Sequence, residues 1–144
     1  MANGQDTATS AEPAYITQLK RAIERGDSSI DLSGQKVGDQ GAEAVAKLLK
    51  QHKSLQTLSL WNNPIGSDGA MHLAEALKGM QNLEGLNLWN NQIGDDGAVC
   101  LAEALKGMHH MKMLDLGGNQ IGSTGREALS KLAGSNPALK VTLD

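Results

Sequence analysis

The hydrophobic positions of this chain recur with a fixed period, and two consecutive segments carry nearly the same pattern. Residues 55–82 read LQTLSLWNNPIGSDGAMHLAEALKGMQN and residues 83–110 read LEGLNLWNNQIGDDGAVCLAEALKGMHH, with 19 of 28 positions identical. A period of this length predicts a solenoid, in which one supersecondary unit stacks on copies of itself. We count four units and a closing strand. Val141 and Leu143 in that strand are shifted by one residue relative to the 28-residue period.

The first half of each unit alternates apolar and polar side chains. In the second unit, Leu58 and Leu60 alternate with Thr57, Ser59 and Trp61. A period of two predicts a strand with one buried face and one exposed face.

An asparagine follows the predicted strand in three units, as Asn63, Asn91 and Asn119. A buried asparagine is tolerated only where its amide bonds the backbone, so these residues predict a ladder between successive turns. Gln35 takes this place in the first unit, where we expect the ladder to weaken.

The second half of each unit has the spacing of an amphipathic helix. Gly66 and Gly69 interrupt the strand and bracket the helix start, where Ser67 or Asp68 is expected to cap the helix. The inward positions recur at helical spacing in the second unit as Ala70, Leu73, Ala74 and Leu77. Each unit is therefore expected to run strand, turn, helix, turn.

The unit carries the motif LxxLxLxxNxI as Leu55, Leu58, Leu60, Asn63 and Ile65, and repeats it one period later. With its length and its second half IGxxGAxxLAEALK, it resembles a leucine-rich repeat of the ribonuclease-inhibitor class. That class also supplies repeat domains of nucleotide-binding innate receptors and Ran GTPase activators. The resemblance implies an α/β fold, a right-handed solenoid forming a short horseshoe arc, with parallel strands on the concave face and helices on the convex face. It implies little about function, because the class serves many unrelated functions.

The chain divides into three segments. Residues 1–12 are polar and rich in small residues, lack the features of a signal peptide, and are predicted to be a disordered tail. Residues 13–26 are predicted to form an N-terminal capping helix that covers the first unit, with Pro13 in its first turn and Gly26 at its end. Residues 27–144 form the predicted repeat domain.

Composition indicates the cellular compartment and excludes two classes of partner. A net charge of −3 argues against a nucleic-acid surface, and no apolar run approaches the ~20 residues of a membrane span. The single cysteine, Cys100, forms no disulfide within the chain, which fits a reducing compartment. We therefore expect a cytoplasmic protein that binds neither nucleic acid nor membrane.

The end of the chain offers no obvious cap for the last strand. An uncovered parallel edge leaves backbone groups without partners and invites a partner chain or self-association. A homo-oligomer through this edge is therefore one hypothesis; the alternative is that a short strand and its terminal charge protect the edge.

The outward strand positions are the predicted binding face, because residues 28 apart should lie side by side there. Trp61 and Trp89 are such a pair and are two of only three aromatic residues. Exposed aromatic side chains are common interface anchors. The predicted partner-binding residues are Trp61, Trp89, Ser59, Asn87, Asp31, Asp115, Thr57 and Met113. In the alternative interpretation, the two rings stack on each other and stabilise the scaffold. The acidic positions favour a neutral or basic partner.

The sequence contains no recognisable catalytic motif. No GxSxG, HExxH or phosphate-loop pattern is present, and the adjacent His109 and His110 lack further ligands at metal spacing. We predict no enzyme activity, cofactor or metal, and a concave face that binds protein or peptide. The first rival hypothesis is a homo-oligomeric structural module that associates through the C-terminal edge strand or the tryptophan face. The second is a regulator that inhibits an enzyme or activates a GTPase, with Lys36 as the one candidate residue for GTPase activation.

Overall fold

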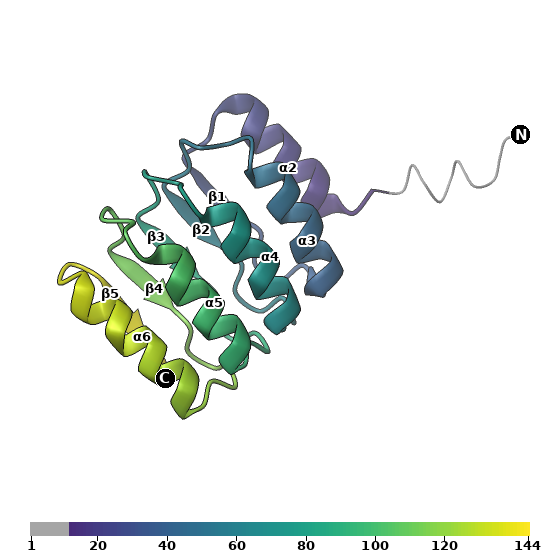
Figure 1. The fold of residues 1–144 in the computed structure, drawn as a ribbon. Helices are drawn as coiled ribbons and strands as arrows, with labels where there is room; N and C mark the ends of the chain where they lie inside the picture. The colour runs from purple at the N-terminus through teal and green to yellow at the C-terminus, as the bar shows by residue number, and fades with distance from the viewer. Residues whose placement is uncertain (1–11) are drawn as a thin grey trace, which may run out of the picture.

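A computed structural model describes residues 12–144, in which strands and helices alternate along the chain (Figure 1). The predicted tail, residues 1–12, lies outside the described residues except for Glu12. The helices are α2 Ala14–Arg25, α3 Gly38–Leu49, α4 Ser67–Leu77, α5 Asp95–Leu105 and α6 Ser123–Ser135. The strands are β1 Ser29–Asp31, β2 Thr57–Ser59, β3 Gly85–Asn87, β4 Met113–Asp115 and β5 Lys140–Thr142.

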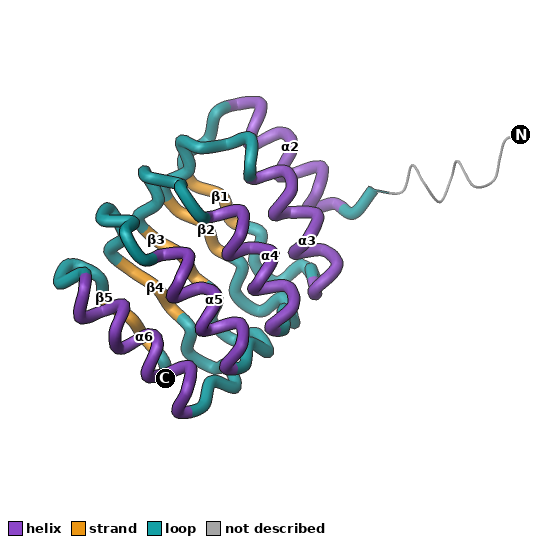
Figure 2. Tube along the Cα trace, in the orientation of Figure 1, coloured by secondary structure: helices purple, strands orange, loops and turns teal. Residues whose placement is uncertain are grey.

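The strands form one parallel sheet in the order β1-β2-β3-β4-β5, with helices α3 to α6 in a second layer on one side (Figure 2). Neighbouring strands align residues 28 apart, so that Leu58 pairs with Leu86 and Leu86 with Leu114. The last strand is one residue out of step, because Leu114 pairs with Val141. The predicted α/β solenoid is confirmed, and we call the sheet surface that faces away from the helices the concave face.

The core lies between the sheet and the helix layer and is built mainly from leucine and alanine, with a few isoleucine, methionine and valine side chains. Leu58 and Leu60 are buried, as the period of two predicts. Gly97 permits α5 to approach α4 closely: a Cβ there would lie 2.8 Å from Ile93 Cγ2 and 3.0 Å from Ser67 Cα. Small residues at these positions keep the repeats in close contact.

The predicted asparagine ladder is present, and the buried Asn91 shows its pattern. The Asn91 side-chain nitrogen donates to the carbonyl oxygens of Leu60 at 3.1 Å and Leu88 at 3.0 Å. Its oxygen accepts the backbone N–H groups of Asn63 at 2.9 Å and Ile65 at 3.0 Å. One amide thus satisfies backbone groups of two successive repeats, which is why it can be buried.

The helix caps are made between repeats, and the prediction that Ser67 or Asp68 caps its own helix is wrong. No side chain caps α4 from within its own helix start. Instead, Asp39 Oδ1 accepts the backbone N–H groups of Gly66 and Gly69 at 2.7 and 3.0 Å. Because the repeats stack, the side chain at one helix start reaches the next helix start, where N–H groups lack partners within the helix.

The same contact recurs along the solenoid. Ser67 Oγ accepts the N–H groups of Gly94 and Gly97 at 3.0 and 3.1 Å. Asp95 Oδ1 accepts those of the two corresponding glycines of the fourth repeat at 2.7 and 3.0 Å. We call this series the cap relay: each repeat completes the helix start of the repeat that follows it.

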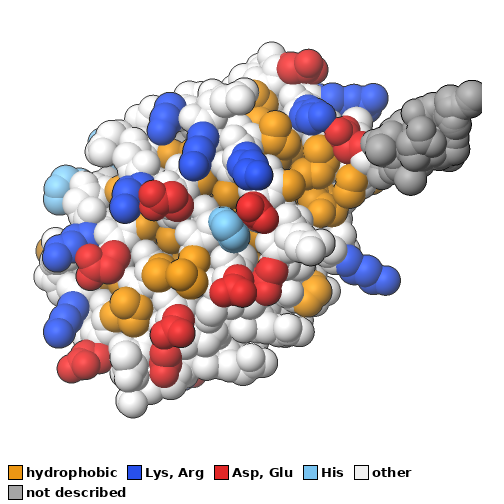
Figure 3. Space-filling model, turned by 45° about the vertical axis from the view of Figure 1, so that its right-hand side comes forward, with side chains coloured by type: hydrophobic (Ala, Val, Ile, Leu, Met, Phe, Trp, Pro, Cys, Tyr) orange, Lys and Arg blue, Asp and Glu red, His pale blue; other side chains and the backbone are white. Residues whose placement is uncertain are grey.

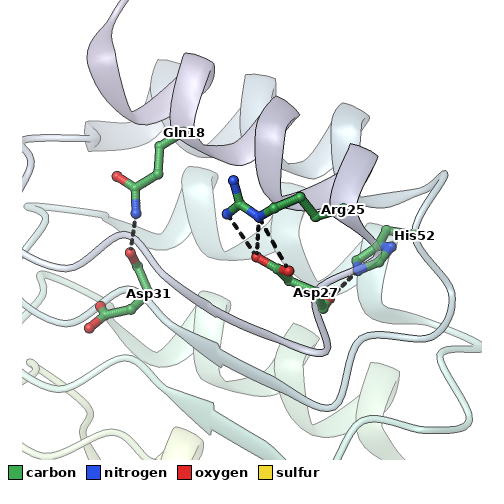
Figure 4. Close-up of polar contacts among 5 residues, drawn as sticks. All are labelled: Gln18, Arg25, Asp27, Asp31 and His52. Atoms are coloured by element: carbon green, nitrogen blue, oxygen red, sulfur yellow. Dashed lines mark hydrogen bonds and ion pairs between the residues drawn. The ribbon is translucent and has the colours of Figure 1, made fainter.

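At the N-terminal end, α2 packs against α3 and lies beside β1 (Figure 4). The side-chain amide of Gln18 donates to the carbonyl oxygen of Asp31 at 2.8 Å. Arg25 forms an ion pair with Asp27 at 2.9 Å, which raises the pKa of the Arg25 guanidinium. The buried ring of His52 hydrogen-bonds the carbonyl oxygen of Asp27. The first strand is thereby tied to the helix beside it.

At the C-terminal end, β5 is the edge of the sheet in the described part of the chain. Ile121, Val141 and Leu143 are only partly buried, although they pack on the core. Ser123, which occupies the place of Asp95 in the cap relay, is exposed. The two ends of the solenoid are therefore built differently.

Candidate functional site

The concave face presents side chains in columns, because the strands are parallel and in register. One column contains Asp31, Ser59, Asn87 and Asp115, which the strand pairing places side by side. Trp61 and Trp89 lie two residues further along β2 and β3, just beyond the ends of those strands. The structure therefore brings both tryptophans and the acidic column to the same surface.

The two tryptophan rings are in contact and remain accessible. Their centroids are 6.0 Å apart with planes at 62°, an edge-to-face arrangement. Trp61 is 38% exposed and Trp89 is 42% exposed. Each precedes an asparagine with a left-handed backbone, Asn62 with φ 59° and Asn90 with φ 58°, which turns the chain at the strand end. The side chains of Asn62 and Asn90 are hydrogen-bonded to each other at 3.1 Å.

A shallow pocket of about 220 Å³ lies at this pair and is lined by Trp61, Asn87, Trp89 and Asp115. Its polar side chains are held by local backbone contacts. Asn87 Oδ1 accepts the Trp89 N–H at 3.0 Å, and Asp115 Oδ1 accepts the Gly117 N–H at 3.0 Å. These two contacts fix the orientation of the polar side chains in the pocket.

Four of the predicted binding residues lie outside this pocket. Thr57 Oγ1 donates to Ser29 Oγ at 2.6 Å, and the hydroxyl of Ser59 is hydrogen-bonded to that of Ser33 at 2.8 Å. Asp31 accepts the Ser33 N–H at 3.0 Å and lies three strands away from Asp115. Met113 is exposed in a separate column, aligned with Gly85 and Lys140.

Gly117, which lies two residues beyond β4 as Trp89 lies two residues beyond β3, contributes to the shape of the site, although it is not among the predicted binding residues. It is buried, and a Cβ at this position would overlap the carbonyl oxygen of Asp144 and lie 2.9 Å from Trp89 Cδ1. The missing side chain is what allows the Trp89 ring and the end of the chain to meet over this strand. A glycine 28 residues after a tryptophan is the sequence signal that identifies it.

The surface of the helix layer differs from the concave face in its distribution of charged side chains. Figure 3 shows acidic and basic side chains interspersed over the face it displays, with small hydrophobic areas between them. A groove of about 290 Å³ between α5 and α6 includes Glu103, Lys106, Glu127 and Lys131 in its lining. Because both signs of charge alternate there, this surface has the character of an ordinary solvated helix face.

The remaining sequence candidates are dispersed. His109 and His110 lie exposed after α5, and residues 12–144 contain no group of three or more potential metal ligands. Lys36 is exposed in the loop before α3 and has a left-handed backbone with φ 55°. Over the same residues, no helix is both long enough and apolar enough to cross a lipid bilayer.

Comparison with known proteins identifies the repeat. A family model described as "Leucine Rich repeat" matches residues 51–74, 79–102 and 107–130, and no curated protein matches the chain. Among solved structures, leiomodin-1 actin-binding site 2 is similar, with 17% identity and a TM-score of 0.77 over 92% of this chain and 81% of that one. The tropomodulin C-terminal domain of Caenorhabditis elegans has 16% identity and a TM-score of 0.77 over 91% of this chain and 83% of that one. At these identities the likeness shows a shared fold.

Proposed function

This chain belongs to the leucine-rich repeat family, and we propose that it is a non-catalytic module that binds a protein or peptide on its concave face. The observation that carries the proposal is the pair Trp61 and Trp89, exposed side by side on the concave face. Tryptophan is enriched among the few interface residues that supply most of the binding energy. A folded protein gains little from exposing two such rings unless another molecule covers them.

The class of partner is supported by two further observations. One similar structure is described as an actin-binding site, so a protein ligand is compatible with this fold. The pocket of about 220 Å³ at the tryptophans is open and smaller than the ~300–1,000 Å³ typical of small-molecule sites. A side chain of a larger partner fits such a pocket better than a cofactor does. The predicted cytoplasmic location belongs to the same proposal and is supported by the lone, free Cys100.

The test is the double variant Trp61→Ala and Trp89→Ala, compared with wild type in binding to peptides selected on wild type from a display library. Met71→Ala is the matched control, because Met71 is 43% exposed but lies on α4 in the helix layer. We expect the double variant to lose binding and the control to keep it. Both should unfold near the wild-type temperature, since the ring contact contributes only ~1 kcal/mol. Unimpaired peptide binding by a folded double variant contradicts the proposal, and a double variant that does not fold assigns the tryptophans to the scaffold.

A second candidate is a homo-oligomer formed through the edge of β5. It is favoured by the position of β5 at the edge of the sheet and by the partial exposure of Val141 and Leu143. Light scattering over a range of concentrations tests it: a rising mass supports self-association, whereas a constant monomer mass at high concentration contradicts it.

A further inference from the structure

We propose that the pocket at Trp61 and Trp89 receives the guanidinium group of an arginine side chain, with Asp115 as its counter-ion. This inference rests on the proposed function and specifies the chemistry of the partner: a protein or peptide that presents an arginine to the concave face. The size, aromatic walls and charge of the pocket each support it.

The pocket has room for one side chain. Its volume of about 220 Å³ and its four lining residues match a single inserted group. The rings of Trp61 and Trp89, inclined at 62°, form two non-parallel walls with their centroids 6.0 Å apart. Tryptophan is the aromatic residue that attracts cations most strongly over its ring face, and arginine is the cation most often found there. A planar guanidinium can also stack on an indole, which an ammonium group cannot do.

The third wall supplies a negative charge with hydrogen-bonding capacity to spare. Asp115 Oδ1 accepts the N–H of Gly117 at 3.0 Å, and in residues 12–144 no hydrogen bond engages Asp115 Oδ2. The bond to Gly117 fixes the carboxylate before the ligand arrives, so little side-chain entropy is lost on binding. A charge-assisted hydrogen bond from a guanidinium to Oδ2 would complete this group.

The surroundings favour a cation over an anion. The lining contains no lysine or arginine. Lys140, on the neighbouring strand β5, lies in a different column from Asp115, beside Met113. An acidic ligand would have to approach Asp115 with no compensating positive charge in the lining, which is unfavourable.

The experiment follows the two indole N–H signals by NMR while the protein is titrated with N-acetyl-arginine amide. The chain has only two tryptophans, so the signals are assigned with Trp61→Phe and Trp89→Phe. N-acetyl-citrulline amide is the probe control, because it has nearly the same shape without the charge. We expect both signals to shift saturably with the arginine probe and far less with the citrulline probe. Equal shifts with both probes, or none with arginine, overturn the proposal.

Variants locate the counter-ion. Asp115→Asn should weaken binding of the arginine probe roughly three- to tenfold, as expected for the loss of one partly exposed charge-assisted hydrogen bond. Asp31→Asn is the matched control, since it removes an equal charge from the same column three strands away, and it should weaken binding less than twofold. Equal losses in the two variants would reduce the effect to general surface charge and overturn the role of Asp115.

The peptide selection separates this inference from the proposed function. Selected peptides that lose binding to the double tryptophan variant and are enriched in arginine support both. Peptides that need the tryptophans but contain no arginine and tolerate Asp115→Asn overturn the inference and leave the proposed function standing. Peptides that bind regardless of the tryptophans overturn both.

Discussion

The apolar side chains at the two ends of the solenoid are buried to different extents. At the N-terminal end, α2 buries Ile16 and Leu19 against the first repeat. At the C-terminal end, β5 is the sheet edge of the described chain, and Val141 and Leu143 are only half covered. A repeat buries its apolar surface only through its neighbours, and in residues 12–144 the fourth repeat has β5 beside it where the first has α2. Stability is therefore expected to decrease from the first end to the second.

The largest expected contrast lies in the core leucines of the two ends. Leu19→Ala should lower the free energy of unfolding by about 2–5 kcal/mol, because Leu19 is fully buried. Leu143→Ala should cost about 1 kcal/mol or less, because part of its side chain already contacts water. Urea denaturation followed by circular dichroism measures both. Equal losses would show that the C-terminal end is covered in solution, and light scattering would then identify a second copy.

Alanine substitutions of two asparagines in the ladder should differ less in their effect on the free energy of unfolding. Asn91→Ala leaves buried backbone groups of two repeats without partners and should cost about 3 kcal/mol. Asn119→Ala should cost clearly less, because Asn119 is half-buried and water can replace part of its bonds. Hydrogen exchange should find the amides of Asn63 and Ile65 less protected in the first variant. Equal costs for the two variants would contradict the contrast.

The cap relay gives a third contrast. Asp95→Ala should cost about 1 kcal/mol, the usual effect of losing a helix cap, and should speed exchange of the Gly122 and Gly125 amides. Ser123→Ala should change stability by less than about 0.5 kcal/mol, because Ser123 is exposed at the open end. Asp96→Ala is the control for charge, since Asp96 is the exposed neighbour of Asp95. Equal losses in the Asp95 and Asp96 variants would indicate a general effect of charge at the helix start.

The smallest effect concerns the start of α2. Hydrogen bonds from Lys20 and Thr17 lower the pKa of Glu12 below its ordinary value of 4.5. A lowered pKa in the folded state stabilises the fold above about pH 4.5, and this contribution is lost as the pH falls through the lowered value. Glu12→Gln should remove this part of the acid sensitivity and leave stability at neutral pH little changed. Thermal unfolding of both proteins between pH 3 and 7, a range chosen around the carboxylate pKa, measures it; parallel curves would contradict the assignment.

The fold could be predicted from the sequence because its hydrophobic and polar positions recur with a fixed period. Leu58 and Leu60 show which face of the strand is buried, and Asn63 and Asn91 occupy a place that only a ladder explains. The closing strand and its shift by one residue could also be predicted from the spacing of Val141.

The cap relay could not be predicted from local spacing. Ser67 lies at the start of its own helix, where caps are ordinarily found, yet it bonds Gly94 and Gly97 of the next repeat. Its effect depends on how closely two helices stack, which one repeat alone does not specify. In retrospect, a small polar residue recurs every 28 residues as Asp39, Ser67, Asp95 and Ser123, and this is the signal.

The candidate site was only partly predictable. The spacing of Trp61 and Trp89 places them side by side, but the angle between their rings depends on packing. The pocket also needs Gly117, whose buried position follows from contacts with Trp89 and the backbone of Asp144.

The cap relay also has a direction, because each cap reaches from one repeat to the repeat that follows it. The second repeat carries both a cap for its successor, Ser67, and the glycine N–H groups that its predecessor caps. Duplication of residues 55–82 in tandem would therefore place Ser67 before another Gly66 and Gly69 and continue the cap relay. Such a duplication would also add a third tryptophan to the row on the concave face. A gene encoding this architecture can therefore lengthen its binding surface in whole units, without redesigning the joint between them.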